Sequence, residues 1–178
     1  MTTPRRNVVD YMQYWSNEAI IADLDTRRSN FSILLDNSLY DLNIGNAIRS
    51  CNAFNGQEVI LYKSKRWDRR SAVGAHNYLK FRHYKEIEDV TAWFMSLPER
   101  PHIVGVDNIP GAQDITKFTW DRSRHTVLVF GQEARSISEN LLALCDDVVY
   151  IRQRGSTRSL NLASAAAVAM HEFCRDLP

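Results

Sequence analysis

Three segments of the sequence carry polar side chains that an ordinary α/β core does not require. The first holds Asn43 and Arg49, six positions apart, and the third holds Ser159 and Asn161. The second is Gly131-Gln132-Glu133. Guanidinium groups bind phosphates with two parallel hydrogen bonds, and hydroxyl, amide and carboxylate groups orient polar substrates. Together these side chains have the chemistry of a site for a phosphate-bearing substrate.

Taken singly, the same residues have simpler explanations. Asn43 fits a helix cap, and Arg49 fits a surface or ion-paired arginine. Ser159 is predicted to cap an alanine-rich helix, and Asn161 also fits capping chemistry. Gly131 alone fits a tight turn. The appearance of all three segments in this order at strand ends favours a functional site.

The elements that position these residues follow from short apolar runs that alternate with helical patterns. Short continuous apolar runs followed by helices are typical of a mostly parallel sheet with helices on both faces. The predicted class is therefore α/β. Strands are expected at residues 31–35, 59–62, 103–106, 127–130 and 148–151, and helices at 44–54, 87–97, 137–144 and 160–173.

The N-terminal part of the chain differs from this alternation. Residues 8–28 are predicted to form an amphipathic helix that includes Val9, Met12, Ile20 and Ile21. Residues 1–30 are therefore interpreted as an N-terminal helical extension of a single domain that spans 31–178. The extension is expected either to dock on the sheet domain or to contact a partner.

Composition excludes several classes of protein. The chain has 178 residues, a formal net charge of +1 and 44% apolar residues, which excludes a disordered or fibrous protein. No apolar run approaches the length of a membrane span and the N-terminus lacks a secretory signal, so a cytoplasmic location is expected. Three cysteines without a CxxC pair fit a reduced compartment. No metal site is predicted, because the cluster 171–174 fits no zinc template.

Basic residues are concentrated in two loops that follow predicted strands. Between Lys63 and Arg70 five of eight residues are basic, and Trp67 lies among them. Such loops can bind nucleic-acid phosphates while the tryptophan stacks on a base, although arginines paired with nearby acids remain an equal alternative. The residues predicted to bind RNA are Lys63, Lys65, Arg66, Arg69, Arg70, Arg152, Arg154 and Arg158.

The glycine pattern excludes two common nucleotide sites. No GxGxxG follows a predicted strand, and no GxxxxGK[ST] occurs in the chain. A Rossmann dinucleotide site and a P-loop are therefore not expected, which argues against a nucleotide-sensing module. Gly131 and Gly155 instead follow two of the predicted strands, where backbone can approach a ligand closely.

With these features in place, the three segments resemble the three motifs of the SpoU/TrmH branch of the SPOUT RNA methyltransferases. In that family the first motif has Asn and Arg six apart, matched by Asn43 and Arg49. The second has G-N-E near a strand end, matched by Gly131-Gln132-Glu133, and the third has S-L-N, matched by Ser159-Leu160-Asn161. The resemblance covers roughly residues 31–175.

The resemblance implies a fold and an activity. It implies a parallel α/β domain whose C-terminal segment forms a trefoil knot, with knot loops that bind S-adenosylmethionine. Two subunits usually pack to complete the active site. The implied reaction is methyl transfer to a ribose 2′-hydroxyl of tRNA or rRNA. The alternative is an RNA-binding member of the same fold with impaired catalysis.

The resemblance also implies roles for individual residues. Arg49 contacts the target nucleotide, Asn43 positions the groups around it, and Glu133 organises its loop and contacts substrate or braces Arg49. Ser159 and Asn161 fix the ribose and the knot loop. The residues expected at the cofactor are Val106, Asp107, Gly131, Ile151 and Leu160.

The sequence departs from the family pattern after Glu133. Where the family usually has Gly-Arg-Gly, this chain has Ala134-Arg135-Ser136. Replacing two glycines restricts the backbone angles available to this loop and puts its course and its affinity for the cofactor in question. The third motif has Arg152-Gln153 where Pro-Met is common, which extends the basic surface.

Overall fold

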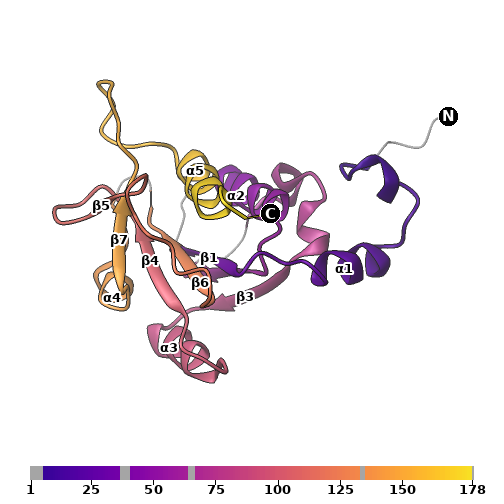
Figure 1. Cartoon of the computed structure of the whole chain (residues 1–178), viewed down its shortest axis with the longest axis horizontal. Helices are drawn as coiled ribbons and strands as arrows, with labels where there is room; N and C mark the ends of the chain where they lie inside the picture. The colour runs from indigo at the N-terminus through magenta and orange to yellow at the C-terminus, as the bar shows by residue number, and fades with distance from the viewer. Residues whose placement is uncertain (1–5, 37–40, 64–66, 133–134, 178) are drawn as a thin grey trace.

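A computed structural model describes residues 6–36, 41–63, 67–132 and 135–177 and has one parallel sheet at its centre (Figure 1). Every pair of neighbouring strands is parallel, in the order β3-β2-β1-β6-β4-β7-β5. All carboxyl ends therefore lie at the same edge of the sheet. The strands are β1 (Phe31–Asp36), β2 (Glu58–Tyr62), β3 (Lys80–Tyr84), β4 (His102–Val106), β5 (Gln113–Asp114), β6 (Thr126–Phe130) and β7 (Asp147–Tyr150).

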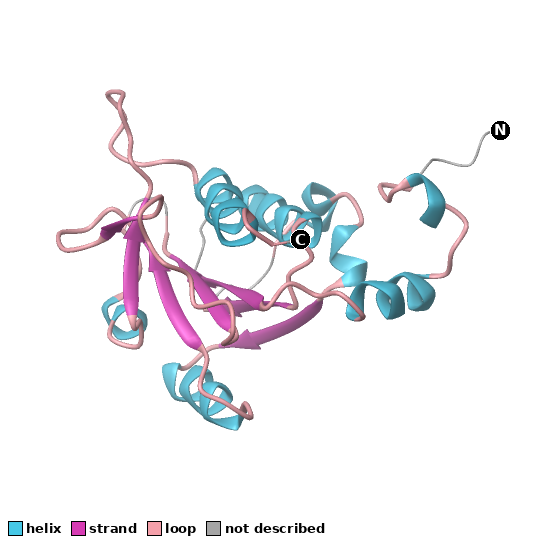
Figure 2. Ribbon diagram, viewed as in Figure 1, coloured by secondary structure: helices cyan, strands magenta, loops and turns pink. Residues whose placement is uncertain are grey.

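Helices cover both faces of this sheet (Figure 2). On one face lie α2 (Asp41–Ala53) and α5 (Leu162–Cys174), and on the other lie α3 (Ile87–Ser96) and α4 (Glu139–Leu142). The predicted α/β class, with a mostly parallel sheet and helices on both faces, is confirmed. The threading of the C-terminal segment into a knot stays a prediction.

The central strands are mostly apolar because both of their faces are covered, although β1 also holds the buried polar residues Ser32 and Asp36. All six residues of β1 are buried. Successive side chains of a strand point to opposite faces, so Ile33 packs with the helices α2 and α5 while Leu34 packs with α3. This double burial explains why the strands appear in the sequence as continuous apolar runs rather than as alternating ones.

The prediction missed the two edge strands. β3 pairs only with β2, and its sequence Lys-Phe-Arg-His-Tyr leaves Lys80 and His83 exposed. β5 has two residues and pairs only with β7. Edge strands of this kind carry polar side chains, so a search for apolar runs does not find them. The predicted helix 137–144 is shorter than expected, since α4 begins only at Glu139.

The N-terminal extension forms two short helices, and the prediction of one helix over residues 8–28 is wrong. A 3-10 helix, η1, spans Asp10–Met12, and α1 spans Asn17–Asp25. The break has a local cause: the Ser16 hydroxyl accepts a hydrogen bond from the Ala19 amide and starts a new helix. The assignment of residues 1–30 as an extension and 31–178 as the SPOUT domain stays a prediction.

The described cysteine side chains are buried or half-buried. Cys51 is fully buried, and desolvation raises the pKa of its thiol to about 12. Burial also raises the pKa of the Cys145 thiol to about 12. Buried in this way, these two thiols act as small apolar side chains. Within the described residues, no helix has the length and apolar character that crossing a bilayer requires.

Two short 3-10 helices join the basic loop to the rest of the domain. They are η2 (Arg69–Ala72) and η3 (Ala75–Tyr78), and both pack against α2. Gly45 allows the approach: a Cβ there would lie 1.7 Å from Ser71 Oγ and 3.0 Å from the Ala72 nitrogen. The Ser71 hydroxyl is held by its hydrogen bond to the Asp68 carbonyl, so it has little freedom to retreat.

We expect Gly45→Ala to destabilise the protein. In an open helix this change stabilises by up to ~1 kcal/mol, whereas overpacking costs about 1–3 kcal/mol. The contact with η2 makes the second effect dominant, so the free energy of unfolding in urea should fall. Asn46→Ala, at an exposed position of the same helix, is the control and should leave stability unchanged or slightly raised. A stabilised Gly45→Ala protein would contradict the close contact.

Candidate active site

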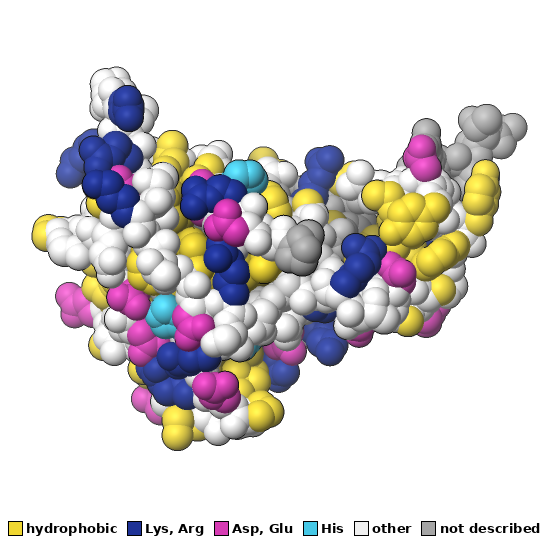
Figure 3. All heavy atoms as spheres, in the orientation of Figure 1, with side chains coloured by type: hydrophobic (Ala, Val, Ile, Leu, Met, Phe, Trp, Pro, Cys, Tyr) yellow, Lys and Arg dark blue, Asp and Glu magenta, His cyan; other side chains and the backbone are white. Residues whose placement is uncertain are grey.

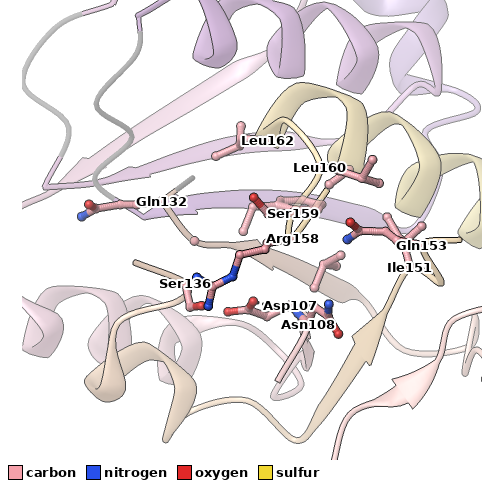
Figure 4. A pocket seen from close by; sticks show the side chains of 14 residues that line it. Asp107, Asn108, Gln132, Ser136, Ile151, Gln153, Arg158, Ser159, Leu160 and Leu162 are labelled. Carbon is pink, nitrogen blue, oxygen red and sulfur yellow. Dashed lines mark hydrogen bonds between the residues drawn. The ribbon is translucent and has the colours of Figure 1, made fainter. Parts of the chain in front are cut away.

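A pocket of about 430 Å³ opens at the carboxyl ends of β4, β6 and β7 (Figure 4). The loops that follow these strands form its walls together with the start of α5. The pocket is lined by all five residues predicted to contact a cofactor, which are Val106, Asp107, Gly131, Ile151 and Leu160. Ser159, predicted to be catalytic, lines it as well.

Two carboxylates at strand ends hold the loop that follows β6. Asp107, after β4, accepts hydrogen bonds from the Asn108 and Ile137 amides, each at 2.8 Å. Asp36, the buried last residue of β1, accepts a hydrogen bond from the Ser138 amide at 2.7 Å. Hydrogen bonds from backbone amides to charged carboxylates are among the stronger ones in proteins. The wall of the pocket is thereby tied to two neighbouring parts of the sheet.

The loop after β6 turns back tightly on Gly131. A Cβ on this residue would lie 2.2 Å from the Ile137 nitrogen and 2.4 Å from the Ser136 carbonyl oxygen, so only glycine fits. The Gln132 amide donates to that same Ser136 oxygen at 3.2 Å. Ser136 has a φ of +61°, in the left-handed region that favours glycine. Ser136 therefore stands where the family usually has its second glycine, and its backbone has the left-handed conformation that glycine favours.

The side chain of Asn161 joins the first and third motifs. Its Oδ1 accepts hydrogen bonds from the Ala163 and Ser164 amides at 2.9 and 3.3 Å, which makes Asn161 the N-cap of α5. The prediction that Ser159 caps this helix is wrong, because α5 begins two positions later than that cap requires. Asn161 Nδ2 donates to Asn43 Oδ1 at 2.8 Å.

The first turn of α5 separates two groups of predicted catalytic residues. Arg49 is exposed on α2 and lines a shallow groove of about 450 Å³ between α2 and α5, together with Asn161. Arg49 is not among the residues that line the pocket, whereas Leu162 and Ser159 are. The structure therefore brings Asn43, Arg49 and Asn161 together on one side, and Ser159 on the other. Glu133 lies outside the described residues.

Some residues predicted to bind RNA are paired with acids. Arg152 forms an ion pair with Asp114 at 2.9 Å, and its hydrogen bond to that carboxylate raises the pKa of Arg152. Arg70 forms an ion pair with Asp68 at 2.7 Å. Exposed pairs of this kind leave the arginine accessible but reduce its net contribution to a positive surface.

The other predicted RNA contacts divide into three groups. Lys63, Arg69 and Arg154 are exposed, and basic side chains gather on the long loop after β7 (Figure 3). Lys65 and Arg66 lie outside the described residues. Arg158 lines the pocket, and its side chain points toward Asp107 in Figure 4. Arg158 is exposed as well as part of the pocket wall, and its contact with RNA stays a prediction.

Trp67 is packed into the domain. Its ring stacks on Phe81 with centroids 6.0 Å apart and an interplanar angle of 18°, and its edge meets His76 at 5.6 Å. The face on Phe81 is occupied, so the interpretation of Trp67 as a free platform for a base is not supported.

Sequence reasoning missed other residues that line the pocket, namely Asn108, Gln132, Ser136 and Gln153. Gln132, Ser136 and Gln153 lie in or beside the second and third motifs, which was a signal in the sequence. Asn108 is marked only by its position after a strand. Gln153 is informative because its Oε1 is buried without a hydrogen-bond partner in the described part of the chain. Such an acceptor is ready to bind a donor group on a ligand.

The backbone of Ser136 gives a direct stability test. Ser136→Gly should raise the free energy of unfolding by about 0.5–1 kcal/mol, since relief of a left-handed residue outweighs the added entropy of glycine in the unfolded chain. Ser138→Gly is the control, because Ser138 has a φ of −62° and gains no such relief. It should lower stability by a similar amount. Changes of the same sign in both proteins would contradict the strain at Ser136. Urea denaturation measures both.

Comparisons with known proteins agree with this geometry. The family model described as the SpoU rRNA Methylase family matches residues 30–171. Over 156 residues the chain is 27% identical to the tRNA (guanosine(18)-2′-O)-methyltransferase of Thermus thermophilus, which covers 85% of this chain and 78% of that protein. It is also 27% identical to the 23S rRNA (uridine(2479)-2′-O)-methyltransferase of Streptomyces viridochromogenes, over 86% of this chain and 56% of that one.

Solved structures have the same fold. The SpoU methyltransferase AviRb from Streptomyces viridochromogenes, in complex with the cofactor AdoMet, superposes with a TM-score of 0.74 and 29% identity. The match covers 83% of this chain and 58% of that chain, so this protein spans less than two thirds of the streptomycete proteins it matches. The family model covers most of the chain, so the resemblance seen in the sequence is confirmed: this chain belongs to the SpoU rRNA methylase family.

Proposed function

We propose that this protein transfers a methyl group from S-adenosylmethionine to a ribose 2′-hydroxyl of tRNA or rRNA. The observation that carries the proposal is the pocket at the ends of β4, β6 and β7, where the five residues expected at the cofactor meet. Family membership supports the same reaction, as do relatives that are tRNA and 23S rRNA 2′-O-methyltransferases. No observation specifically favours an RNA-binding member that has lost catalysis.

The residues of the pocket fit S-adenosylmethionine. Ile151 and Leu160 offer apolar surface to the adenine, and Gln153 Oε1 is an unpartnered acceptor for a donor group. Arg158 supplies a cation for the carboxylate of the methionine part. Gly131 keeps the floor free of a side chain because none could fit there.

The cofactor supplies a methyl group that is already activated on a sulfonium, so the chain has two tasks. It must align the 2′-oxygen with the carbon–sulfur bond, which contributes up to ~7–11 kcal/mol in favourable cases. It must also assist removal of the hydroxyl proton, which typically adds about 10²–10⁴-fold. We assign Ser159 to alignment of the ribose, because it lines the pocket beside the cofactor residues.

Arg49 acts on the substrate rather than as a base. Arginine stays protonated in proteins, so Arg49 binds a phosphate of the RNA and stabilises the developing negative charge on the 2′-oxygen. The phosphate or a water accepts the proton. The Asn43–Asn161 hydrogen bond holds α2 against the start of α5, and so positions Arg49, which lies between one and two helix turns along from Asn43. For Glu133 the role in organising its loop and contacting substrate or bracing Arg49 remains the sequence-based proposal.

A homodimer completes the site in this proposal. Arg49 and the pocket lie on different sides of the first turn of α5, so a second subunit is the simplest way to bring an Arg49 to the cofactor. The groove beside Arg49 is lined by small side chains, among them Ser50, Ala53 and Ala167, which let a second helix approach closely. A cytoplasmic location belongs to the same proposal.

Removal of the Arg49 guanidinium tests the catalytic assignment. Arg49→Ala should lose at least about 10²-fold in methyl transfer to total tRNA or rRNA. Its affinity for S-adenosylmethionine should be unchanged, because Arg49 does not line the pocket. Radiolabelled methyl transfer and calorimetry measure the two quantities. Full activity of Arg49→Ala would refute the role.

A mixture of variants tests whether Arg49 acts across a dimer. Gly131→Ala should fail to bind the cofactor, because its Cβ would collide with the backbone of Ser136. When inactive Arg49→Ala and Gly131→Ala subunits are allowed to exchange, random pairing restores about a quarter of the sites if Arg49 serves its partner's pocket. No recovery would show that Arg49 acts within its own subunit, and a monomer by light scattering would overturn the dimer.

Removal of the Arg158 guanidinium tests its assignment to the carboxylate of the cofactor. Arg158→Gln should weaken binding of S-adenosylmethionine by about tenfold or more, since a hydrogen bond to a charged group is lost. Binding of 5′-methylthioadenosine, which has no carboxylate, should not change. Arg154→Gln, in the same loop but outside the pocket lining, is the matched control and should bind both molecules normally. Equal loss of affinity for both molecules in Arg158→Gln would contradict the assignment. Titration calorimetry measures each affinity.

A further inference from the structure

A second cavity, of about 490 Å³, lies between the N-terminal extension and the domain. Its walls come from Val9 and Tyr11 of the extension on one side and from Arg49 and Asn52 of α2 on the other. Arg49 borders both this cavity and the groove that leads to α5. The cavity is therefore adjacent to the residue proposed to bind the target nucleotide.

The extension that forms the outer wall is fixed to the domain. Arg6 donates hydrogen bonds to Asn17 Oδ1 at 2.7 Å and to Tyr78 Oη at 2.8 Å. Arg28 donates to the Tyr78 carbonyl at 2.7 Å. Met12 and Ile20 pack with Tyr78 in a small apolar cluster. The cavity is thus enclosed by ordered elements that are held together on both sides of Tyr78.

The chemistry of the lining suits a nucleotide. Val8, Val9 and Met12 give it apolar walls, and the Oδ1 of Asn52 is buried without a hydrogen-bond partner in the described chain. Arg49 lines it as well, as does Arg27, which is ion-paired with Asp23 at 2.9 Å, and none of the described lining residues is acidic. An apolar slot with an amide edge matches a base, and a guanidinium matches a phosphate.

Aromatic side chains stand at the outer wall of this cavity. Tyr11 is 59% exposed and packs edge-on against Trp15, with ring centroids 5.8 Å apart. Its hydroxyl accepts a hydrogen bond from Arg27 at 3.2 Å. Figure 3 shows hydrophobic side chains gathered over the extension. Exposed aromatic rings beside a cation are typical platforms for unpaired bases.

We propose that this cavity binds the base of an unpaired nucleotide that flanks the methylated ribose, with the adjoining phosphate on Arg49. The inference rests on the proposed function, because it takes the RNA substrate as the occupant. Tyr11 stacks on the base and Asn52 accepts a hydrogen bond from its polar edge. The extension then selects substrates with an unpaired nucleotide next to the target, as in a loop.

The test compares two cavity variants with a control on the same extension. Tyr11→Ala should weaken binding of total tRNA, or of fragmented ribosomal RNA tested separately, by about fivefold or more. Asn52→Leu keeps the volume and removes the acceptor, and should weaken it by about threefold or more. Tyr14→Ala is the control, because Tyr14 is 99% exposed but does not line the cavity. Affinity for S-adenosylmethionine should be unchanged in all three.

The outcomes separate this inference from the proposed function. If the unaltered protein methylates RNA while Tyr11→Ala and Asn52→Leu bind RNA as tightly as Tyr14→Ala does, the cavity proposal is overturned and the function stands. If the unaltered protein neither methylates nor binds either RNA, both fail. If Tyr11→Ala changes the mass in solution but keeps its RNA affinity, the cavity belongs to an interface between copies, and the proposal is overturned.

Discussion

The arrangement of the site depends on one carboxamide, that of Asn161. Its oxygen caps α5 and its nitrogen donates to Asn43, so the same side chain starts the helix and fastens that helix to α2. A cap alone contributes about 1 kcal/mol, and serine or aspartate would serve equally well. A carboxamide carries its acceptor and its donor on separate atoms, so it can cap the helix and donate to a second partner at once, whereas a carboxylate has no donor and a hydroxyl has a single oxygen for both. The residue type therefore follows from the double task.

The position of Asn161 separates the residues that line the pocket from those that line the groove beside Arg49. Residues directly before Asn161 line the pocket, and the face of α5 that begins at Asn161 lines the groove beside Arg49. The opposite wall is held by carboxylates at the ends of β1 and β4, and by a glycine that admits no side chain. Strand ends thus form the pocket, and paired helices form the groove. The two sides belong to different layers of one fold.

The sequence predicted the strands that are made of apolar runs. It missed the polar edge strand and the choice between two possible helix caps. Five strands and the edge where they end were predictable because their sequences are continuous apolar runs, which are typical of the parallel strands of an α/β domain. The polar edge strand β3 was not, since nothing in its pattern requires burial. Ser159 and Asn161 are both suitable N-cap residues for α5. Sequence spacing could not show that a hydrogen bond to Asn43 favours Asn161. Nor could spacing show on which side of α5 Arg49 lies.

The charge of the chain constrains how it recognises RNA. The two basic loops follow β2 and β7, four positions apart in the sheet and so roughly 20 Å from one another. Two of their arginines are paired with Asp68 and Asp114, which lowers the net positive charge that these loops offer to the phosphates of RNA. Electrostatic attraction of that size guides association but does not select a nucleotide. Selectivity must then come from shape, stacking and hydrogen bonding near the reacting ribose. The described structure offers such groups beside Arg49, between α2 and the extension.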